Sequence, residues 1–335
     1  MRYLVSGATG FVGQALTQSL TSQGHEVHAL VRNTPAKLPK GATPFTAEFS
    51  KEGINHDTSL SDSDNARQAL LISQLLNALK EVEVVIHTAA RVHVMNETTT
   101  DPLSEFRAIN RDATLLLASL AAQAGVKRFV FLSSIKVNGE NTAFGSPFTA
   151  DDTPNPSDPY GLSKLEAEQG LFELSQKTAM EVVIIRPPLI YGPGVKANFA
   201  VMMKWVKLGI PLPFASVNNR RSLVALDNLI DFIELCASPT LSPKAANEVF
   251  LVADATPVST RTLLQTIAKA YGQKARIWPF PVTIMRMGAA LLGKKALSER
   301  LFGNLELDAS KNKKLLSWQA KTSMMQQLQK MVGKD

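Results

Sequence analysis

Short apolar runs alternate along the first half of the chain with longer stretches in which apolar positions recur at the helical period. The apolar runs cover residues 2–6, 26–31, 82–87, 128–134 and 181–186. The helical stretches cover residues 11–23, 65–79, 103–124 and 161–178. This alternation predicts an α/β fold with a parallel, doubly wound sheet, because right-handed crossovers return each strand beside an earlier one. Ligands of such a sheet bind at the carboxyl ends of its strands.

The alternation weakens after about residue 190, which predicts a smaller C-terminal α/β substrate domain beside the Rossmann-type sheet. Further helical stretches cover residues 197–208, 227–237, 259–271 and 310–332. An apolar run from Glu248 to Val252 is expected to rejoin the main sheet. The predicted domains are a dinucleotide-binding domain, 1–186 with 215–252 returning to it, and a substrate-binding domain, 187–214 with 253–335.

Two further segments carry structural expectations. The apolar run from Trp278 to Gly293 is interrupted by Arg286 and is too short to span a bilayer, so it predicts a buried or partner-facing helix. Residues 50–64 are polar and predict an exposed, mobile loop.

Composition favours a protein of the cytoplasm without a metal centre. Met1 leads directly into a strand-like segment, with no signal-peptide pattern, so we expect a cytoplasmic location. Cys236 is the only cysteine, which excludes an internal disulfide and a thiolate metal cluster. Any redox chemistry must therefore come from a bound organic cofactor.

The formal net charge is +7, which is compatible with nucleic acid, an acidic membrane surface or a phosphorylated small molecule as partner. Lys and Arg are scattered, and their densest clusters, at Lys294–Lys295 and 311–314, carry no interleaved aromatic residues. Nucleic acid is therefore not expected as a partner.

A glycine-rich segment follows the first predicted strand and opens a helix. Gly7 permits a tight turn, and Gly10 lets backbone N–H groups approach a pyrophosphate at the positive end of that helix. The predicted cofactor contacts here are Gly7, Thr9, Gly10, Phe11, Val12 and Gly13. Small residues after a later strand, Ala89 and Ala90, give a dinucleotide room to lie against the backbone.

The second strand ends in Val31 and Arg32, where a carboxylate that binds an NAD ribose would otherwise stand. An arginine at this place can bind a 2′-phosphate, although it can equally stack on adenine or stay solvated. The expected cofactor is NAD(P)(H), with NADP(H) slightly favoured by Arg32.

Tyr160 and Lys164 lie four residues apart, on one face of the helix that begins after Asp158. A phenol must lose about three pKa units to exchange protons near neutrality, and Lys164 together with a positive cofactor ring can supply that shift. Ser134 ends the fifth strand, so its hydroxyl is expected in the same crevice. Asn110 can bind a water that connects Lys164 to solvent.

Together these residues resemble the extended short-chain dehydrogenase/reductases, and within them the nucleotide-sugar epimerase/dehydratase family, over nearly the whole chain. The resemblance implies that Tyr160 is the acid/base, that Lys164 is its pKa partner and a ribose ligand, and that Ser134 orients the sugar oxygen. It also implies cofactor contacts by Asn110 and Pro187. The substrate contacts implied or considered are Arg91, Ser134, Lys136, Asn198, Arg221 and Arg300, and His93 follows a strand in the same way.

The residues after Ser134 bear on the reaction. Dehydratases of the family carry Asp-Glu there, whereas this chain has Ile135 and Lys136, which cannot perform that acid/base work. Two reactions remain for a UDP-hexose or UDP-N-acetylhexosamine: epimerisation at C4, and reduction of the 4-keto form. Both are typical of surface-polysaccharide synthesis. Leu189 replaces a common Asn and suits a 6-deoxy or acetamido sugar.

Two alternatives to a sugar enzyme stay open: a reductase of a non-sugar ketone, and a non-catalytic dinucleotide-binding sensor. The retained Ser134, Tyr160 and Lys164 speak against the sensor. The resemblance further implies a homodimer through the helices 103–124 and 161–178.

Overall fold

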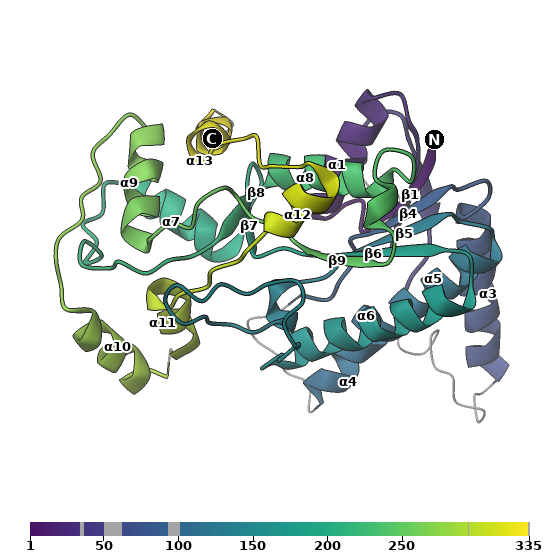
Figure 1. The fold of residues 1–335 in the computed structure, drawn as a ribbon, viewed down its shortest axis with the longest axis horizontal. Coiled ribbons are helices and arrows are strands. Elements are labelled where there is room, and N and C mark those ends of the chain that lie inside the picture. Colours follow the sequence, from purple (N-terminus) through teal and green to yellow (C-terminus); the bar gives the residue numbers. More distant parts are fainter. Residues whose placement is uncertain (34–36, 50–61, 93–100, 294, 334–335) are drawn as a thin grey trace. The chain divides into compact units, whose positions relative to one another are not determined.

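The computed structural model describes residues 1–33, 37–49, 62–92, 101–293 and 295–333 (Figure 1). The expected loop at 50–64 and His93 therefore fall almost wholly outside the described residues. The chain divides into two compact units. The first comprises Met1–Gly139, Thr153–Arg186 and Ile230–Phe250, and the second comprises Glu140–Asp152, Pro187–Leu229 and Leu251–Asp335.

A sheet that has seven strands in the described residues forms the centre of the first unit, in the order β3-β2-β1-β4-β5-β6-β9. Its strands are β1 (Arg2–Ser6), β2 (Glu26–Val31), β3 (Ala42–Thr46), β4 (Val84–His87), β5 (Arg128–Leu132), β6 (Glu181–Arg186) and β9 (Glu248–Leu251). The pairings from β3 through β6 are parallel. The strand order reverses direction between β1 and β4, which is where a doubly wound sheet opens a ligand crevice.

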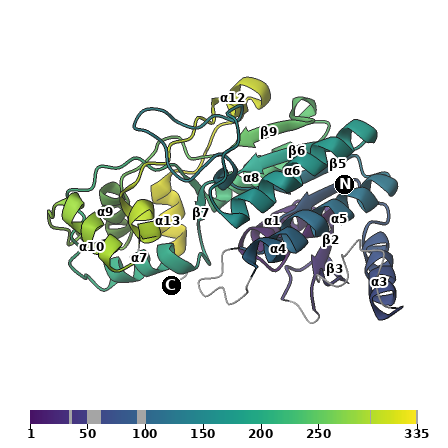
Figure 2. The ribbon, with the colours of Figure 1, turned by 90° about the horizontal axis from the view of Figure 1, so that it is seen from below.

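Helices cover both faces of this sheet (Figures 1 and 2). One face carries α3 (Asp62–Ala78), α4 (Pro102–Arg107), α5 (Ala113–Gln123) and α6 (Pro159–Lys177), and the other carries α1 (Phe11–Ser22) and the later part of α8 (Leu226–Ala237). The strands β1, β4, β5 and β6 are almost completely buried, because helices cover both of their sides. Their predicted apolar runs form one core with the inner sides of α3, α5 and α6.

The second unit packs helices around a small parallel sheet of β7 (Leu189–Tyr191) and β8 (Leu223–Ala225). Its helices are α7 (Ala197–Lys207), α9 (Thr260–Ala270), α10 (Val282–Leu291), α11 (Lys295–Phe302), α12 (Ser310–Leu316) and α13 (Met324–Val332). A separate core joins the inner sides of α7, α9 and α13. None of the helices in the described ranges is both long enough and apolar enough to cross a membrane.

The structure differs from the sequence-based expectations at five places. The segment that returns to the first unit is Ile230–Phe250, shorter than 215–252, and residues 140–152 belong to the second unit. The expected helix 310–332 is two helices, because Ser317 has a left-handed φ of 54°. The edge strand β3, with its exposed positions and Pro44, was not predicted. Finally, α10 has no buried residue, so the expected helix is not a buried one, and the partner-facing alternative stays a prediction.

Candidate active site

The glycine-rich loop between β1 and α1 is held by close backbone contacts. Gly7 has a φ of 69°, and a side chain there would stand 2.7 Å from the backbone nitrogen of Ala89. A side chain on Gly13 would overlap the carbonyl oxygen of Gly7. Gly10 is the N-cap of α1, and no side chain caps that helix end. The first N–H groups of α1 are therefore left to meet an anion.

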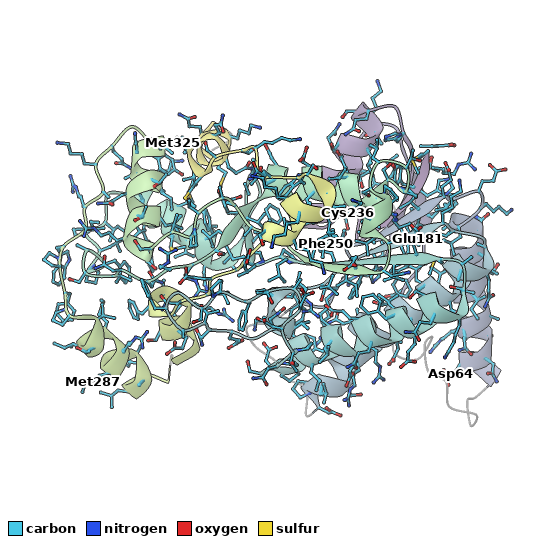
Figure 3. All side chains as sticks on the ribbon, in the orientation of Figure 1. Asp64, Glu181, Cys236, Phe250, Met287 and Met325 are labelled. Atoms are coloured by element: carbon cyan, nitrogen blue, oxygen red, sulfur yellow. The ribbon has the colours of Figure 1, made fainter. Side chains whose placement is uncertain are left out.

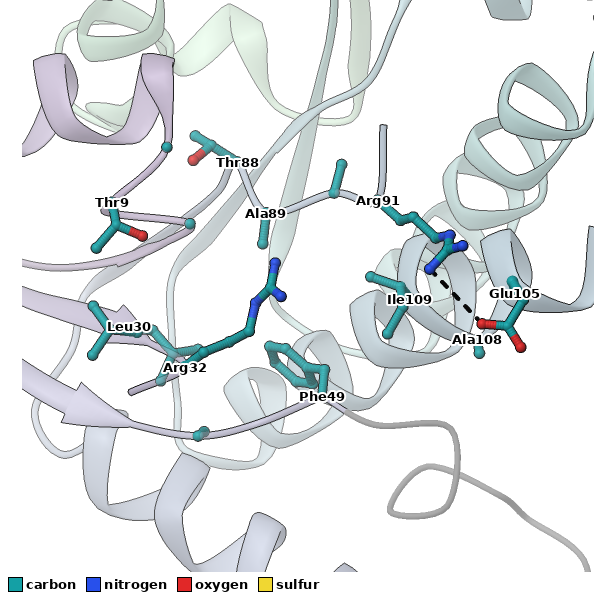
Figure 4. A pocket seen from close by; sticks show the side chains of 15 residues that line it. Thr9, Leu30, Arg32, Phe49, Thr88, Ala89, Arg91, Glu105, Ala108 and Ile109 are labelled. Atoms are coloured by element: carbon teal, nitrogen blue, oxygen red, sulfur yellow. Dashed lines mark ion pairs between the residues drawn. The ribbon is translucent and has the colours of Figure 1, made fainter. Parts of the chain in front are cut away.

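A pocket of about 520 Å³ opens beside this loop, at the carboxyl ends of β1, β2 and β4 (Figure 4). It is lined by Gly7, Thr9, Gly10, Leu30, Val31, Arg32, Ala47, Phe49, Thr88, Ala89, Ala90, Arg91, Glu105, Ala108 and Ile109. The volume lies in the range of cofactor sites, and the lining combines small residues with a helix N-terminus. These residues fit a dinucleotide.

Charge in the pocket favours an additional anion. Arg32 points across the pocket toward Ala89, next to the ring of Phe49 (Figure 4). Among the described lining residues the single carboxylate is Glu105, which pairs with Arg91 at 3.9 Å. No lining carboxylate therefore follows β2, where an NAD ribose is usually bound.

Ser134 and Tyr160 meet at the end of β5. Ser134 caps a short 3-10 turn over Ile135–Val137, and its hydroxyl lies close enough to that of Tyr160 to lower the pKa of the phenol. Tyr160 lies in the first turn of α6, whose N-cap Asp158 accepts a hydrogen bond from the Gly161 N–H at 2.7 Å. Burial raises the pKa of Tyr160 to about 12, although the hydroxyl of Ser134 acts in the opposite direction.

Lys164 is 1% exposed and lies one helical turn after Tyr160. Its Nζ donates a hydrogen bond to the Leu132 carbonyl at 2.9 Å and lies 4.3 Å from the centre of the Phe131 ring. Burial lowers the pKa of Lys164 to about 7. The sequence-based expectation was that Lys164 together with a positive cofactor ring lowers the pKa of Tyr160. In the protein by itself, burial of the phenol raises that pKa.

A buried ion pair stands behind these residues, and sequence reasoning missed it. Glu168 is 2% exposed and accepts hydrogen bonds from Ser133 and from Arg186, whose Nε lies 3.0 Å from Oε1 of Glu168. Arg186 also donates to Asn138 at 2.9 Å. The signal was present, because Glu168 follows Lys164 by four residues and so lies on the same helix face. Ser133 therefore ties β5 to α6, while Ser134 faces Tyr160.

Asn110 lies in a π-helical turn, Ala108–Asp112, which joins α4 to α5. Its side-chain amide donates to the Arg91 carbonyl and to Ser163, and its oxygen accepts from the Arg91 N–H at 2.8 Å. Both amide donors are thus engaged by the protein, and the expected water contact of Asn110 stays a prediction. Asn110 fixes the backbone of Arg91 at the pocket edge.

His87, at the end of β4, is fully buried between two hydroxyls. Nδ1 lies 2.6 Å from Ser6 Oγ, and Nε2 lies 2.9 Å from Thr114 Oγ1. Burial and the charge of Lys164 lower the pKa of His87 to about 3, so the ring is neutral at physiological pH. It joins β1, β4 and α5 beneath the pocket.

The remaining predicted residues divide between the two units. In the first unit, Lys136 pairs with Asp158, and Phe11, Val12 and Gly13 belong to α1 behind the lining. In the second unit, Pro187 is buried, Asn198 begins α7 half-buried, and Arg300 is exposed on α11. The structure therefore brings Ser134, Tyr160 and Lys164 together, and it describes Asn198, Arg221 and Arg300 only within the second unit.

Arg221 is held near Arg300 inside the second unit. Its Nη1 donates to the carbonyls of Glu299 and Gly303 at 3.3 and 3.2 Å. Burial, and then the charge of Arg300, lower the pKa of Arg221 to about 10. Two neighbouring cations of this kind are a favourable place for an anion.

Comparison with known proteins gives one consistent family. The model of the NAD dependent epimerase/dehydratase family matches residues 3–250. A UDP-glucose 4-epimerase of Vibrio cholerae is 43% identical over 317 residues, covering 94% of this chain and 89% of that protein. A 3 beta-hydroxysteroid dehydrogenase/Delta 5-->4-isomerase of Mycobacterium tuberculosis is 28% identical, covering 83% of this chain and 70% of that protein.

Solved structures share the fold. A UDP-glucose 4-epimerase from Thermotoga maritima with UDP-glucose superposes with a TM-score of 0.74 at 21% identity, covering 99% of this chain and 98% of that chain. A UDP-N-acetylglucosamine 4-epimerase from Bacillus cereus gives the same TM-score and coverage at 18% identity. At these identities the likeness establishes the fold alone.

Proposed function

This chain belongs to the NAD-dependent epimerase/dehydratase family, and we propose that it catalyses epimerisation at C4 of a UDP-linked hexose or N-acetylhexosamine. The observation that carries the proposal is the pair formed by Ser134 and Tyr160, with Lys164 one helical turn further on, in the unit that holds the dinucleotide pocket. The Vibrio cholerae relative, a UDP-glucose 4-epimerase, supports the same reaction.

In the proposed mechanism Tyr160 moves one proton in each half of the reaction. Oxidation of the C4 carbinol to a ketone removes two electrons and two hydrogens, of which the hydroxyl proton goes to the phenolate oxygen of Tyr160. The same proton returns when the ketone is reduced on its opposite face, so the sugar is changed only in its configuration. A bound nicotinamide supplies the two-electron redox chemistry. Ser134 donates a hydrogen bond to the C4 oxygen and so holds it beside Tyr160.

Tyr160 must become a phenolate for this chemistry, and its surroundings determine the cost. Its pKa of about 12 leaves the phenol protonated at neutral pH. A positive charge near the hydroxyl would lower that pKa, and Lys164, with its own pKa of about 7, is half protonated near neutrality. We therefore assign Lys164 two roles, electrostatic support of the phenolate and binding of the cofactor ribose.

Substrate contacts are proposed in both units. Arg91 and Lys136 lie in the first unit and would face the hexose or its phosphates. In the second unit Asn198 and the neighbouring cations Arg221 and Arg300 would bind the diphosphate, because bidentate guanidinium groups match phosphate oxygens. A cytoplasmic location agrees with this proposal, since its substrate and cofactor are both soluble nucleotides.

Assay of the purified protein with UDP-glucose and UDP-N-acetylglucosamine tests the proposal. We expect NMR to show the galacto isomer without net consumption of NAD(P)H. The Tyr160→Phe variant should lose at least a hundredfold in kcat while cofactor binding, followed by nicotinamide fluorescence, is retained. If wild-type protein binds cofactor but interconverts neither sugar, the proposed reaction is wrong.

A second candidate is one-way reduction of a 4-keto sugar by NADPH. Arg32 favours it, because an exchangeable NADPH suits a reductase, and the half-exposed Leu189 removes a polar contact at a sugar position. A UDP-4-keto-6-deoxy-N-acetylhexosamine given with NADPH distinguishes the two reactions. Stoichiometric loss of absorbance at the nicotinamide band, with no isomerisation of the parent sugars, would establish the reductase.

We propose that NADP(H) binds more tightly than NAD(H), because Arg32 reaches into the pocket and no lining carboxylate follows β2. The Arg32→Asp variant should weaken NADP(H) at least tenfold and tighten NAD(H), as measured by titration calorimetry. Arg32→Gln serves as the matched control. It removes the positive charge but does not add a carboxylate that could accept hydrogen bonds from the ribose hydroxyls. Unchanged NADP(H) affinity in both variants would show that Arg32 only stacks or stays solvated.

A further inference from the structure

One segment of the second unit, residues 255–298, carries cations and no acids. Residues 255–298 contain seven of the 36 Lys and Arg and none of the 29 Asp and Glu, so the other 29 cations are matched by 29 acids. The cations themselves are scattered along the chain, and it is the acids that are missing here. The segment by itself therefore carries a formal charge of +7.

The same segment exposes apolar side chains. Ile284, Met287 and Leu291 lie at helical spacing on one face of α10 and are 52%, 66% and 87% exposed, and no residue of α10 is buried. Leu292, after the end of the helix, is also exposed. Figure 1 shows α10 at the left edge of the ribbon, and Figure 3 places Met287 on it.

The same segment of the sequence carries further exposed side chains. Trp278 is 45% exposed and packs edge-on against Phe280, just before α10 begins. The cations of the segment whose side chains are described are all exposed. They are Arg261, Lys269, Lys274, Arg276 and Arg286.

We infer that α10 and its flanking residues from Trp278 to Leu292 form a docking surface for an anionic lipid bilayer. Helices that lie in the plane of a membrane interface combine an apolar face, a tryptophan and surrounding cations. Charge complementarity favours this occupant, because the segment has cations only and the inner leaflet is anionic. A second copy is disfavoured, since a two-fold contact would set this cationic surface against itself.

The surface lies in the second unit and shares no residue with the proposed active site. The protein would remain water-soluble and associate reversibly, because one short helix buries too little apolar area for permanent anchoring. Its attraction to the bilayer should depend on salt, since each cation near an anionic surface contributes about a fivefold factor in partitioning at moderate ionic strength.

Co-sedimentation of the full-length protein with vesicles tests the inference. Vesicles of phosphatidylcholine alone are compared with vesicles that also contain phosphatidylglycerol, at low and at high salt. We expect binding to the anionic vesicles at low salt, with at least tenfold weaker binding to the neutral ones. Binding that is absent, or equal for both compositions, would overturn the inference.

Three variants localise the effect. Met287→Glu with Leu291→Glu should reduce binding at least tenfold, and Arg286→Gln, at the exposed cation of α10, should reduce it more at low salt than at high salt. Leu241→Glu is the matched control, because Leu241 is 74% exposed in the other unit and receives the same charge change. If the α10 variant binds as well as the control, the inference is wrong.

Sedimentation velocity without vesicles tests whether a second copy of this chain, instead of a bilayer, covers α10. If Met287→Glu with Leu291→Glu converts a dimer into a monomer, α10 is a contact between copies and the membrane assignment falls. Turnover of the proposed sugar substrate should be unchanged in the α10 variant, which shows that the unit is folded and that the surface acts independently of the active site.

Discussion

Burying the amine of Lys164 at the candidate active site costs free energy. An amine that is 1% exposed gives up most of its hydration, and one carbonyl and one aromatic ring replace only part of it. The depressed pKa of about 7 is the measure of that cost. A function that needs this amine would explain why so unfavourable a group is retained.

Lys164→Met should therefore raise the free energy of unfolding while removing activity. Between about pH 7 and 10 the unfolded chain binds a proton that the folded chain does not, so stability of the wild-type protein rises with pH in this window. The variant loses that slope. Urea unfolding should show a gain of roughly 2 kcal/mol at pH 7 that shrinks toward pH 10. A variant less stable than wild type at pH 7 would show that the amine is well solvated.

At the scale of elements, the ion pair of Glu168 with Arg186 fastens α6 to β6. Both side chains are nearly inaccessible, and Ser133 and Asn138 complete their hydrogen bonds. Because α6 carries Tyr160 and Lys164, this pair sets where the proposed catalytic residues lie relative to the end of β5. We expect this ion pair to matter more for positioning α6 than for the free energy of unfolding, because the attraction within a buried pair offsets little more than the cost of desolvating its two charges.

Removing one partner should cost more than removing both. Arg186→Met leaves the Glu168 carboxylate buried without its cation and should lower the free energy of unfolding by about 3–5 kcal/mol. Arg186→Met with Glu168→Leu removes both charges and should recover at least half of that loss in chemical denaturation. A double variant as unstable as the single one would mean that packing, not charge, dominates at this place.

The main strands and the catalytic helix could be predicted from the sequence, because β1, β4, β5 and β6 are buried on both faces and read as continuous apolar runs. The edge strand β3 could not, since only one neighbour and few buried contacts define it. The split of 310–332 depends on one left-handed residue, Ser317, whose conformation no periodicity reveals.

The candidate site could also be predicted only in part from the sequence. Residue spacing indicated Tyr160 and Lys164, and the end of a strand indicated Ser134. Spacing could not show that Asn110 lies in a π-helical turn, because such a turn shifts the helical register by one residue. It therefore could not show that the amide of Asn110 donates to the Arg91 carbonyl and to Ser163. Nor could it give the direction of the pKa shift of Tyr160, which depends on burial in three dimensions.

At the scale of the whole molecule, we expect a homodimer through α4, α5 and α6. The outward face of α6 carries the half-buried Leu162 and Leu165 on a helix whose inner face is already packed on the sheet. Light scattering should give twice 36.4 kDa, and Leu165→Glu should halve it. Leu70→Glu, at an exposed site on α3, is the control that should leave the mass unchanged. A wild-type monomer would contradict the expectation.

In its described part, the chain passes between its two units at five points, after residues 139, 152, 186, 229 and 250. This alternation between the two units limits what recombination can exchange. A single recombination event cannot exchange the second unit for that of a relative, because its three segments are interspersed among the three segments of the first. A single crossover that changes the second unit therefore either leaves part of it behind or also replaces part of the first unit.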